Sequence, residues 1–267
     1  MKLFSLDELK TFQVEMLKKV ADYCDSNNLT YFLAFGTLLG AVRHKGYIPW
    51  DDDIDIIMPR RDYSFFLEHF NGQIPNLFVI APEIDPEYYA TYANVYDNRT
   101  LLIEESVSHG KMELGVKIDI FPLDFVPSEE KLYDELWKRS RSDVHRLIIK
   151  NKKLSFYHGM ERVKVAIKKL QYSFDNTRNI QERHLKLLND ERYKSDGPLM
   201  DIVAITFRKF ALPQDCYFPI RKLSFEGYEF NVPQDYDKVL SRIYGDYMKL
   251  PPEEARIAKH CFNAFWK

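Results

Sequence analysis

Cysteine is scarce in this sequence, and the three that occur, Cys24, Cys216 and Cys261, lie far apart. No Cys-x-x-Cys pair or His/Cys cluster predicts a zinc site, and no cysteine framework predicts disulfides. A reducing, cytoplasmic setting is therefore expected. With 10 glycines and 13 prolines among 267 residues, the composition also excludes a low-complexity or disordered chain.

Long apolar runs and an excess of one charge are absent too. No stretch approaches the roughly 18 apolar residues of a membrane-spanning helix, and MKLFSLDELK turns polar too early for a signal peptide. Because 38 Lys and Arg face 40 Asp and Glu, the net charge of −2 excludes a general polyanion binder. The chain is 45% hydrophobic and 15% aromatic, enough for the core of one large domain or a domain with an added subdomain.

Hydrophobic spacing predicts alternating helices and short strands. Ser5 and Glu8 form a predicted capping box for a helix that ends near residues 26–28. Thr37 is expected to cap a short helix over residues 38–43. Further helices are expected at residues 62–70 and 236–244, and long basic helices between about 129 and 201. Strands are expected at residues 31–35, 53–58, 77–80, 92–96, 101–105 and 116–121, and a hairpin is expected in FEGYEFNVP.

This order of elements fits an α+β core with a helical insertion. Three parts are expected: residues 1–128 as a core that carries the active site, 129–210 as a basic helical region, and 211–267 as a part that completes the active-site cleft.

Four aspartates occur within five residues, namely Asp51, Asp52, Asp53 and Asp55. Because alternate residues of a strand share a face, Asp53 and Asp55 are expected to project together while Ile54 enters the core. Asp119 lies in a second predicted strand, within KIDIF. If the two strands pair, three carboxylates converge.

Oxygen ligands of this kind suit Mg²⁺ or Mn²⁺ rather than zinc. A solvated acidic turn is the alternative. An EF-hand is excluded because Ile56 stands where glycine is needed and Asp62 where glutamate is needed. A glycosyltransferase Asp-x-Asp motif is disfavoured because only 50 residues precede Asp51, too few for a nucleotide-binding half.

The order strand, Gly-Thr, short helix, Asp-Ile-Asp and a third Asp resembles the nucleotidyltransferase superfamily, in which Gly-Gly or Gly-Ser is usual in place of Gly36-Thr37. The longer segments GTLLGAVRHKGYIPWDDDID, KIDIFPLD and YGDYMKLPP resemble the LicD family, which includes fukutin-related proteins. The resemblance implies a nucleotidyltransferase-like mixed sheet with flanking helices and a helical insertion.

The same resemblance implies a magnesium-dependent (or manganese-dependent) phosphotransferase. It would move phosphocholine from CDP-choline to a sugar hydroxyl of a teichoic acid or lipopolysaccharide precursor, releasing CMP. Ribitol or glycerol phosphate as the transferred group, a small-molecule nucleotidyltransferase, and an inactive sugar-phosphate-binding protein remain alternatives.

By resemblance, Asp53, Asp55 and Asp119 bind the metal, with Asp119 either a ligand or the general base. The predicted substrate-binding residues are Gly36, Thr37, Arg43, His44, Lys45, Trp50, Asp246 and Tyr247. A structural role in a turn or in the core is the alternative for His44, Lys45, Trp50 and the Asp246-Tyr247 pair, and the same choice applies to Arg256 and His260. The tyrosines at 88, 89, 92 and 96 either pack in the core or offer cation–π contacts to a quaternary ammonium.

A basic segment lies in the middle of the chain. Between Lys138 and Lys169 there are eleven Lys or Arg against two acids, Asp143 and Glu161. Either these charges form a solvated helix face, or they rest on an anionic membrane at the inner face of the cell membrane. In the second case, Lys150, Lys152, Lys153, Lys168 and Lys169 are expected to contact lipid. Nucleic acid is not expected, since no nucleic-acid-binding motif is present.

Overall fold

The computed structural model describes residues 1–110, 112–200, 211–257 and 262–267. The helices are α1 (Leu6–Ser26), α2 (Phe35–Arg43), α3 (Arg60–His69), α4 (Glu130–Asn151), α5 (Gly159–Gln171), α6 (Thr177–Leu188) and α7 (Tyr236–Tyr244). The strands are β1 (Lys2–Leu3), β2 (Phe32–Leu33), β3 (Asp55–Pro59), β4 (Leu77–Ile80), β5 (Ala93–Asp97), β6 (Thr100–Glu104), β7 (Lys117–Phe125), β8 (Leu199–Met200), β9 (Arg221–Phe225), β10 (Tyr228–Val232) and β11 (Phe262–Trp266).

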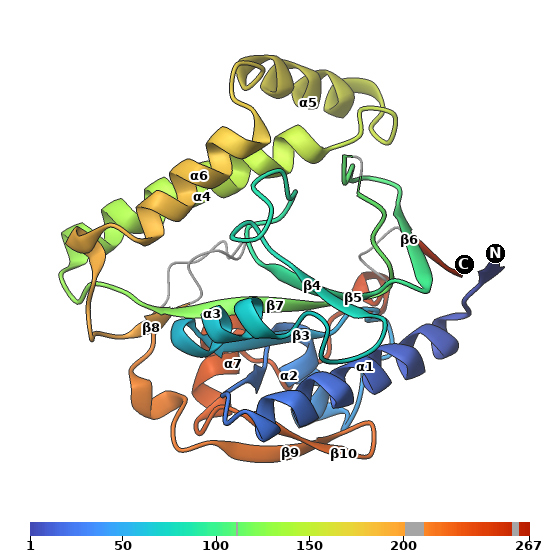
Figure 1. Ribbon diagram of the computed structural model, residues 1–267, viewed down its shortest axis with the longest axis vertical. Coiled ribbons are helices and arrows are strands. Elements are labelled where there is room, and N and C mark those ends of the chain that lie inside the picture. Colours follow the sequence, from blue (N-terminus) through green and yellow to red (C-terminus); the bar gives the residue numbers. More distant parts are fainter. Residues whose placement is uncertain (111, 201–210, 258–261) are drawn as a thin grey trace.

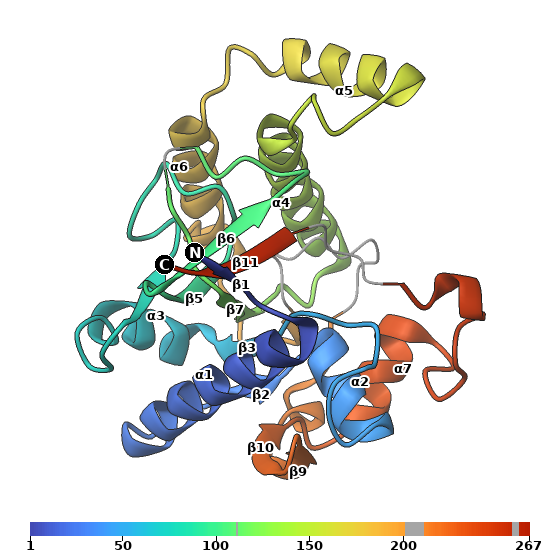
Figure 2. The same cartoon turned by 90° about the vertical axis from the view of Figure 1, so that its right-hand side faces the viewer.

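The central sheet has the order β2-β3-β7-β5-β4, and β8 pairs with the far end of β7. β3 and β7 are parallel and the other pairs are antiparallel. In Figures 1 and 2, α4 and α6 lie above this sheet, and α1, α2 and α7 lie below it. The α+β class predicted from the sequence is confirmed.

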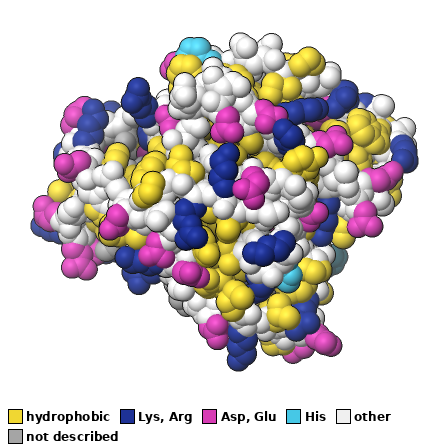
Figure 3. Space-filling view, turned by 90° about the horizontal axis from the view of Figure 1, so that it is seen from below, with side chains coloured by type: hydrophobic (Ala, Val, Ile, Leu, Met, Phe, Trp, Pro, Cys, Tyr) yellow, Lys and Arg dark blue, Asp and Glu magenta, His cyan; other side chains and the backbone are white. Residues whose placement is uncertain are grey.

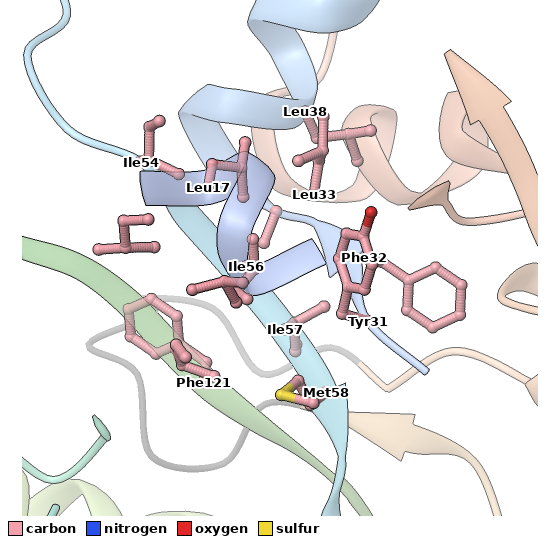
Figure 4. Packing of buried hydrophobic residues seen from close by; sticks show 14 of the residues in the cluster. Leu17, Tyr31, Phe32, Leu33, Leu38, Ile54, Ile56, Ile57, Met58 and Phe121 are labelled. Carbon is pink, nitrogen blue, oxygen red and sulfur yellow. The ribbon is translucent and has the colours of Figure 1, made fainter. Parts of the chain in front are cut away.

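β3 lies deep in the hydrophobic core. Ile54, Ile56 and Met58 are completely buried, and Figure 4 shows Ile56 close to Leu17 of α1 and Phe121 of β7. Each such side chain contributes about 1.5–3 kcal/mol through removal of apolar surface from water. This packing holds β3, and therefore Asp55 at its start, in a fixed position.

The predicted capping box of α1 is present. The Ser5 hydroxyl accepts a hydrogen bond from the Glu8 amide at 3.2 Å, and the Glu8 carboxylate accepts one from the Ser5 amide at 2.9 Å. α1 ends at Ser26, as the sequence indicates.

The prediction that Thr37 caps a helix is wrong. β2 covers only Phe32–Leu33, and α2 begins at Phe35 with Ala34 as its N-cap. The Ala34 amide donates to the Asp55 carbonyl at 3.0 Å, so the chain turns into α2 directly after pairing with β3. Phe35 has φ = +42°, a backbone conformation that is unfavourable for an aromatic residue, and its ring packs edge-on against Phe121.

The strand expected to begin at Asp53 begins instead at Asp55. The other predicted strands lie within a few residues of their expected bounds, except that β7 runs on to Phe125; the hairpin of β9 and β10 and helix α7 are confirmed. The sequence did not indicate the small sheet β1-β11-β6, in which both ends of the chain pair side by side.

α4, α5 and α6 lie in the expected helical region 129–210, which also contains β8. Residues 201–210 of this region lie outside the described residues. The domain boundaries themselves stay predictions. Within the described ranges, no helix combines the length and apolarity needed to cross a bilayer. Cys24 and Cys216 are buried free thiols, whereas His260 and Cys261 fall outside the described residues.

Candidate active site

Asp55 and Asp119 are direct neighbours on the parallel strands β3 and β7. Both carboxylates are largely buried, with 8% of each residue exposed. The Asp119 amide donates to the Ile54 carbonyl at 2.9 Å, and the Asp55 amide donates to the Thr37 hydroxyl at 2.8 Å. Thr37 therefore positions the start of β3 beside α2.

The negative charges of this group act on one another. Burial, followed by the charges of Asp53 and Asp119, raises the pKa of Asp55 well above its ordinary value. Asp53 itself precedes β3, in a segment where Asp51, Asp52 and Asp53 offer oxygens that all lie within 4.8 Å of one another. The acidic residues thus form a continuous group along the entry to β3 and its first residue.

Gly36 makes room for this group. A Cβ atom at position 36 would lie 2.5 Å from Oδ2 of Asp51, so a larger residue here would displace the Asp51 carboxylate from its position at the first turn of α2. The predicted contact of Gly36 with phosphate stays a prediction.

A divalent cation fits the chemistry of these donors. Buried carboxylates whose negative charges repel one another are stabilised when a cation lies between them. Oxygen-only donors suit Mg²⁺ or Mn²⁺. The binding of either ion by Asp53, Asp55 and Asp119 stays a prediction, and the proximity of Asp51 and Asp52 to Asp53 adds them as candidate ligands.

Two polar side chains orient Asp119. Its Oδ1 accepts hydrogen bonds from Nδ2 of Asn94 at 2.6 Å and from Nζ of Lys117 at 2.7 Å. Asn94 is completely buried, lies opposite Asp119 on β5, and accepts in turn from the Tyr88 hydroxyl. Burial alone would lower the pKa of Lys117, but the Asp119 carboxylate raises it well above its ordinary value, so this lysine is cationic.

A pocket of about 300 Å³ opens beside these groups. Asp53, Lys117 and Asp119 line one part of it. The remaining wall combines tyrosines with apolar side chains of α4 and residues from other elements, namely Gln13, Asp52, Tyr89, Ala90, Thr91, Tyr92, Leu102, Glu104, Val107, Val144, Leu147, Ile148, Asn151, Lys152, Tyr157 and Phe262. Of the four tyrosines singled out from the sequence, Tyr89 and Tyr92 line the pocket.

A second cluster joins α2 to the segment after α7. Arg43 donates to the Tyr247 carbonyl at 2.6 Å and, through Nε, to Nε2 of His44 at 2.9 Å. The His44 and Trp50 rings lie 6.3 Å apart, and the Arg256 guanidinium lies 5.7 Å from the Trp50 ring centre. Arg43, His44, Trp50 and Tyr247 are therefore brought together, and Arg43 fixes the position of the Tyr247 backbone.

Lys45 and Asp246 lie at exposed turns. The Lys45 carbonyl accepts from the Glu226 amide at 3.0 Å, which places this turn against the β9–β10 hairpin. The Asp246 carbonyl accepts from Lys249 at 3.2 Å, while the Tyr247 side chain is buried and donates its hydroxyl to Asp237. The contacts of these residues are structural, and their roles toward substrate stay predictions.

Sequence reasoning missed Lys117, Asn94 and Tyr244. Lys117 was detectable, because residues 117 and 119 share a face of the predicted strand. Burial, followed by the negative charges of Asp55, Asp51 and Asp53, raises the pKa of Tyr244, so its hydroxyl lies near the carboxylates although part of the residue is exposed. The sequence did not indicate that Asn94 belongs to the site, because its position beside Asp119 depends on the pairing of β5 with β7.

Comparison with known proteins identifies the family. A family profile described as "LicD/FKTN/FKRP, nucleotidyltransferase domain" matches residues 28–166, a range that includes Asp53, Asp55, Asp119 and Tyr157. The chain belongs to the LicD family. The lipopolysaccharide cholinephosphotransferase LicD of Haemophilus influenzae is 30% identical over 281 residues, which cover 99% of this chain and 99% of that protein.

Two further matches are local. An uncharacterized protein of Rickettsia typhi is 39% identical over 66 residues, 24% of this chain and 21% of that protein. An uncharacterized protein of Rickettsia prowazekii is 46% identical over 48 residues, 18% of each.

Proposed function

We propose that this LicD-family enzyme transfers phosphocholine from CDP-choline to a sugar hydroxyl of a lipopolysaccharide or teichoic acid precursor and releases CMP. The observation that carries this function is that Asp119, the register partner of the buried Asp55, lines a pocket that tyrosines also line. The full-length similarity to a lipopolysaccharide cholinephosphotransferase supports it.

The reaction is a phosphoryl transfer, in which positioning and charge neutralisation account for most of the catalysis. The acceptor oxygen forms a bond to the phosphorus that carries choline. The bond from that phosphorus to the oxygen bridging the two phosphates breaks, and CMP leaves with the electron pair. Asp119 is our candidate for accepting the hydroxyl proton. The side-chain hydrogen bonds from Asn94 and Lys117 both reach Oδ1, which leaves Oδ2 for a proton or a metal.

Asp53, Asp55 and Asp119 would hold Mg²⁺ or Mn²⁺, which when bound neutralises phosphate charge and polarises the reacting phosphorus. Lys117 adds a fixed positive charge to the same end of the pocket. We expect it to stabilise the negative charge that phosphate oxygens carry in the transition state.

The pocket supports choline over ribitol or glycerol as the transferred group. A trimethylammonium group is recognised by aromatic faces and nearby negative charge, and Tyr89, Tyr92 and Tyr157 line the pocket together with Glu104. The Lys152 ammonium lies 4.7 Å from the Tyr157 ring centre, so a choline group on this ring face would take the place of Lys152. A polyol would instead need several hydrogen-bonding groups in place of the apolar wall from α4.

The proposed setting is the cytoplasm at the inner face of the cell membrane, where a lipid-linked saccharide precursor would be the acceptor. A donor panel tests the function. The protein is incubated with Mg²⁺, a lipopolysaccharide or teichoic acid saccharide as acceptor, and CDP-choline, CDP-ribitol, CDP-glycerol or CTP, and nucleotide release is measured. We expect CMP from CDP-choline. Release of CMP only from CDP-ribitol or CDP-glycerol would show that the transferred group is not phosphocholine. Release of pyrophosphate from CTP would show that the reaction is nucleotidyl transfer.

A further inference from the structure

Helix α5 exposes its apolar side to solvent. Met160, Val163, Ile167 and Leu170, which we call the apolar stripe, have exposed fractions of 71%, 49%, 53% and 72%. Of the α5 residues, all of which the structure describes, only Val165 is buried. A helix that packs on a globular core normally turns its apolar face inward, so α5 has the reverse orientation.

Specific contacts hold α5 in this orientation. The Lys169 ammonium donates to the carbonyl oxygens of Lys150 and Lys152, at 2.5 Å and 2.7 Å, on the same side of the helix as Val165. Residues 160, 163, 167 and 170 recur at intervals of three and four and therefore occupy the opposite side. The apolar stripe continues in Phe174, just beyond the helix, which is 98% exposed.

α5 lies at an extremity of the molecule. Figures 1 and 2 show it at the end of the α4–α6 pair, opposite the β9–β10 hairpin. The face on the hairpin side has acidic and basic side chains interspersed with apolar ones (Figure 3). Because α5 forms the opposite end of the molecule, a flat surface can approach this helix from outside without meeting the central sheet.

The charges beside the apolar stripe identify the kind of surface it fits. α5 carries Arg162, Lys164, Lys168 and Lys169 against a single acid, Glu161. Helices with an apolar side flanked by lysine and arginine lie in the interface of anionic bilayers. We propose that α5 docks this protein on an anionic membrane, with the apolar stripe in the acyl boundary and Lys164 and Lys168 at the headgroups.

This surface differs from the one expected from the basic segment alone. Lys169 is used in the contacts that hold α5, and the Lys153 ammonium donates to the Glu104 carbonyl at 2.6 Å. Lys152 lies over the Tyr157 ring at the pocket. Three of the five lysines expected to contact lipid are thus engaged inside the protein, and the apolar stripe becomes the main determinant of docking.

Docking through α5 would bring the candidate active site near the membrane. Tyr157 lines the pocket and stands two residues before the first residue of α5. Its neighbour Phe156 is 36% exposed and extends the apolar surface toward the pocket. The short chain between pocket and helix limits how far the two can separate.

Vesicle sedimentation of the full chain tests this docking. Wild type is expected to sediment with vesicles that contain phosphatidylglycerol and to remain in solution with pure phosphatidylcholine. The double variant Ile167→Ser with Leu170→Ser should bind anionic vesicles at least about tenfold more weakly. Lys164→Gln and Lys168→Gln should each weaken binding by about fivefold. The matched control, Ile84→Ser with Ile220→Ser, removes two other exposed apolar side chains and should bind as wild type does.

The outcomes are distinct. Equal vesicle binding by wild type and the Ile167/Leu170 variant would overturn the docking, as would failure of wild type to bind anionic vesicles. Sedimentation equilibrium without lipid tests whether a second copy of the chain covers the apolar stripe instead. If wild type were a dimer and the Ile167/Leu170 variant a monomer, the apolar stripe would be an interface between copies of the chain rather than a membrane-docking surface. Because donor and acceptor are absent, these results leave the proposed reaction untouched.

Discussion

Replacing Asp55 by asparagine should stabilise the metal-free protein while it removes metal binding. The variant keeps the size of the side chain but removes one charge from a buried acidic group. Burial is the largest cause of the raised pKa of Asp55, and the charges of Asp53 and Asp119 follow. Asparagine avoids all of these effects.

The expected magnitude follows from the sheet. Asp55 and Asp119 are register partners on neighbouring strands, which lie about 4.8 Å apart. Two unit charges at this separation repel by about 3.5 kcal/mol at an effective dielectric constant of about 20. Because the Lys117 ammonium offsets part of this repulsion, we expect Asp55→Asn to raise the free energy of unfolding by about 1–3 kcal/mol in EDTA.

Chemical denaturation with and without Mg²⁺ measures both effects. Mg²⁺ should stabilise wild type by mass action and leave Asp55→Asn nearly unchanged. The folded-state pKa of Asp55 is raised, so in EDTA its contribution to stability is present at acidic pH and is lost as pH rises through that pKa. The variant should lack this loss.

Asp124→Asn is the matched control, and it should change the free energy of unfolding in the opposite direction. The Asp124 carboxylate accepts two hydrogen bonds from Arg60, both at 2.7 Å, so its loss should destabilise the protein by about 1.5–3 kcal/mol. If Asp55→Asn were less stable than wild type in EDTA and responded equally to Mg²⁺, Asp55 would be a structural carboxylate rather than part of a cation site.

Three further predictions concern neighbouring residues. Lys117→Met should lower kcat by about 10- to 100-fold, because it removes the positive charge expected to stabilise the transition state and a charged hydrogen bond to Asp119. A change confined to KM would contradict this. Tyr157→Ala should raise KM for CDP-choline by about three- to thirtyfold, whereas Tyr157→Phe should have a KM close to that of wild type. If the alanine variant had the same KM as wild type, Tyr157 would not contact choline. Arg43→Met should lower the free energy of unfolding by about 1.5–3 kcal/mol through the lost contact with the Tyr247 carbonyl; unchanged urea denaturation would contradict a structural role.

Local features of the fold were predictable from the sequence. The Ser5–Glu8 capping box depends on residues three apart and formed as expected. The carboxylates were predictable because strand alternation assigns faces: Asp119 stands beside Asp55 as anticipated. The start of this strand was predicted two residues too early, at Asp53, because pairing with β2 begins only after the chain has passed the acidic segment.

Features that depend on distant contacts were not predictable. Phe35 looked like the end of a strand, yet the contact of Ala34 with Asp55 turns the chain into α2 there. The pairing of β1 with β11 joins the two ends of the chain, which no local pattern encodes. For α5, periodicity reveals an apolar side but not whether that side faces the core, because this depends on the contacts of Lys169 with the end of α4.

CMP release from CDP-choline by wild type and Asp119→Asn, compared in Mg²⁺ with the same saccharide acceptor, tests the central claim most directly. The asparagine side chain would keep the shape of the aspartate at the junction of β3 and β7 but remove the negative charge proposed to bind metal or accept the proton. We expect turnover by wild type and a loss of at least about 1000-fold in the variant, with unchanged circular dichroism. Turnover of the variant within about tenfold of wild type would contradict the assignment of the active site.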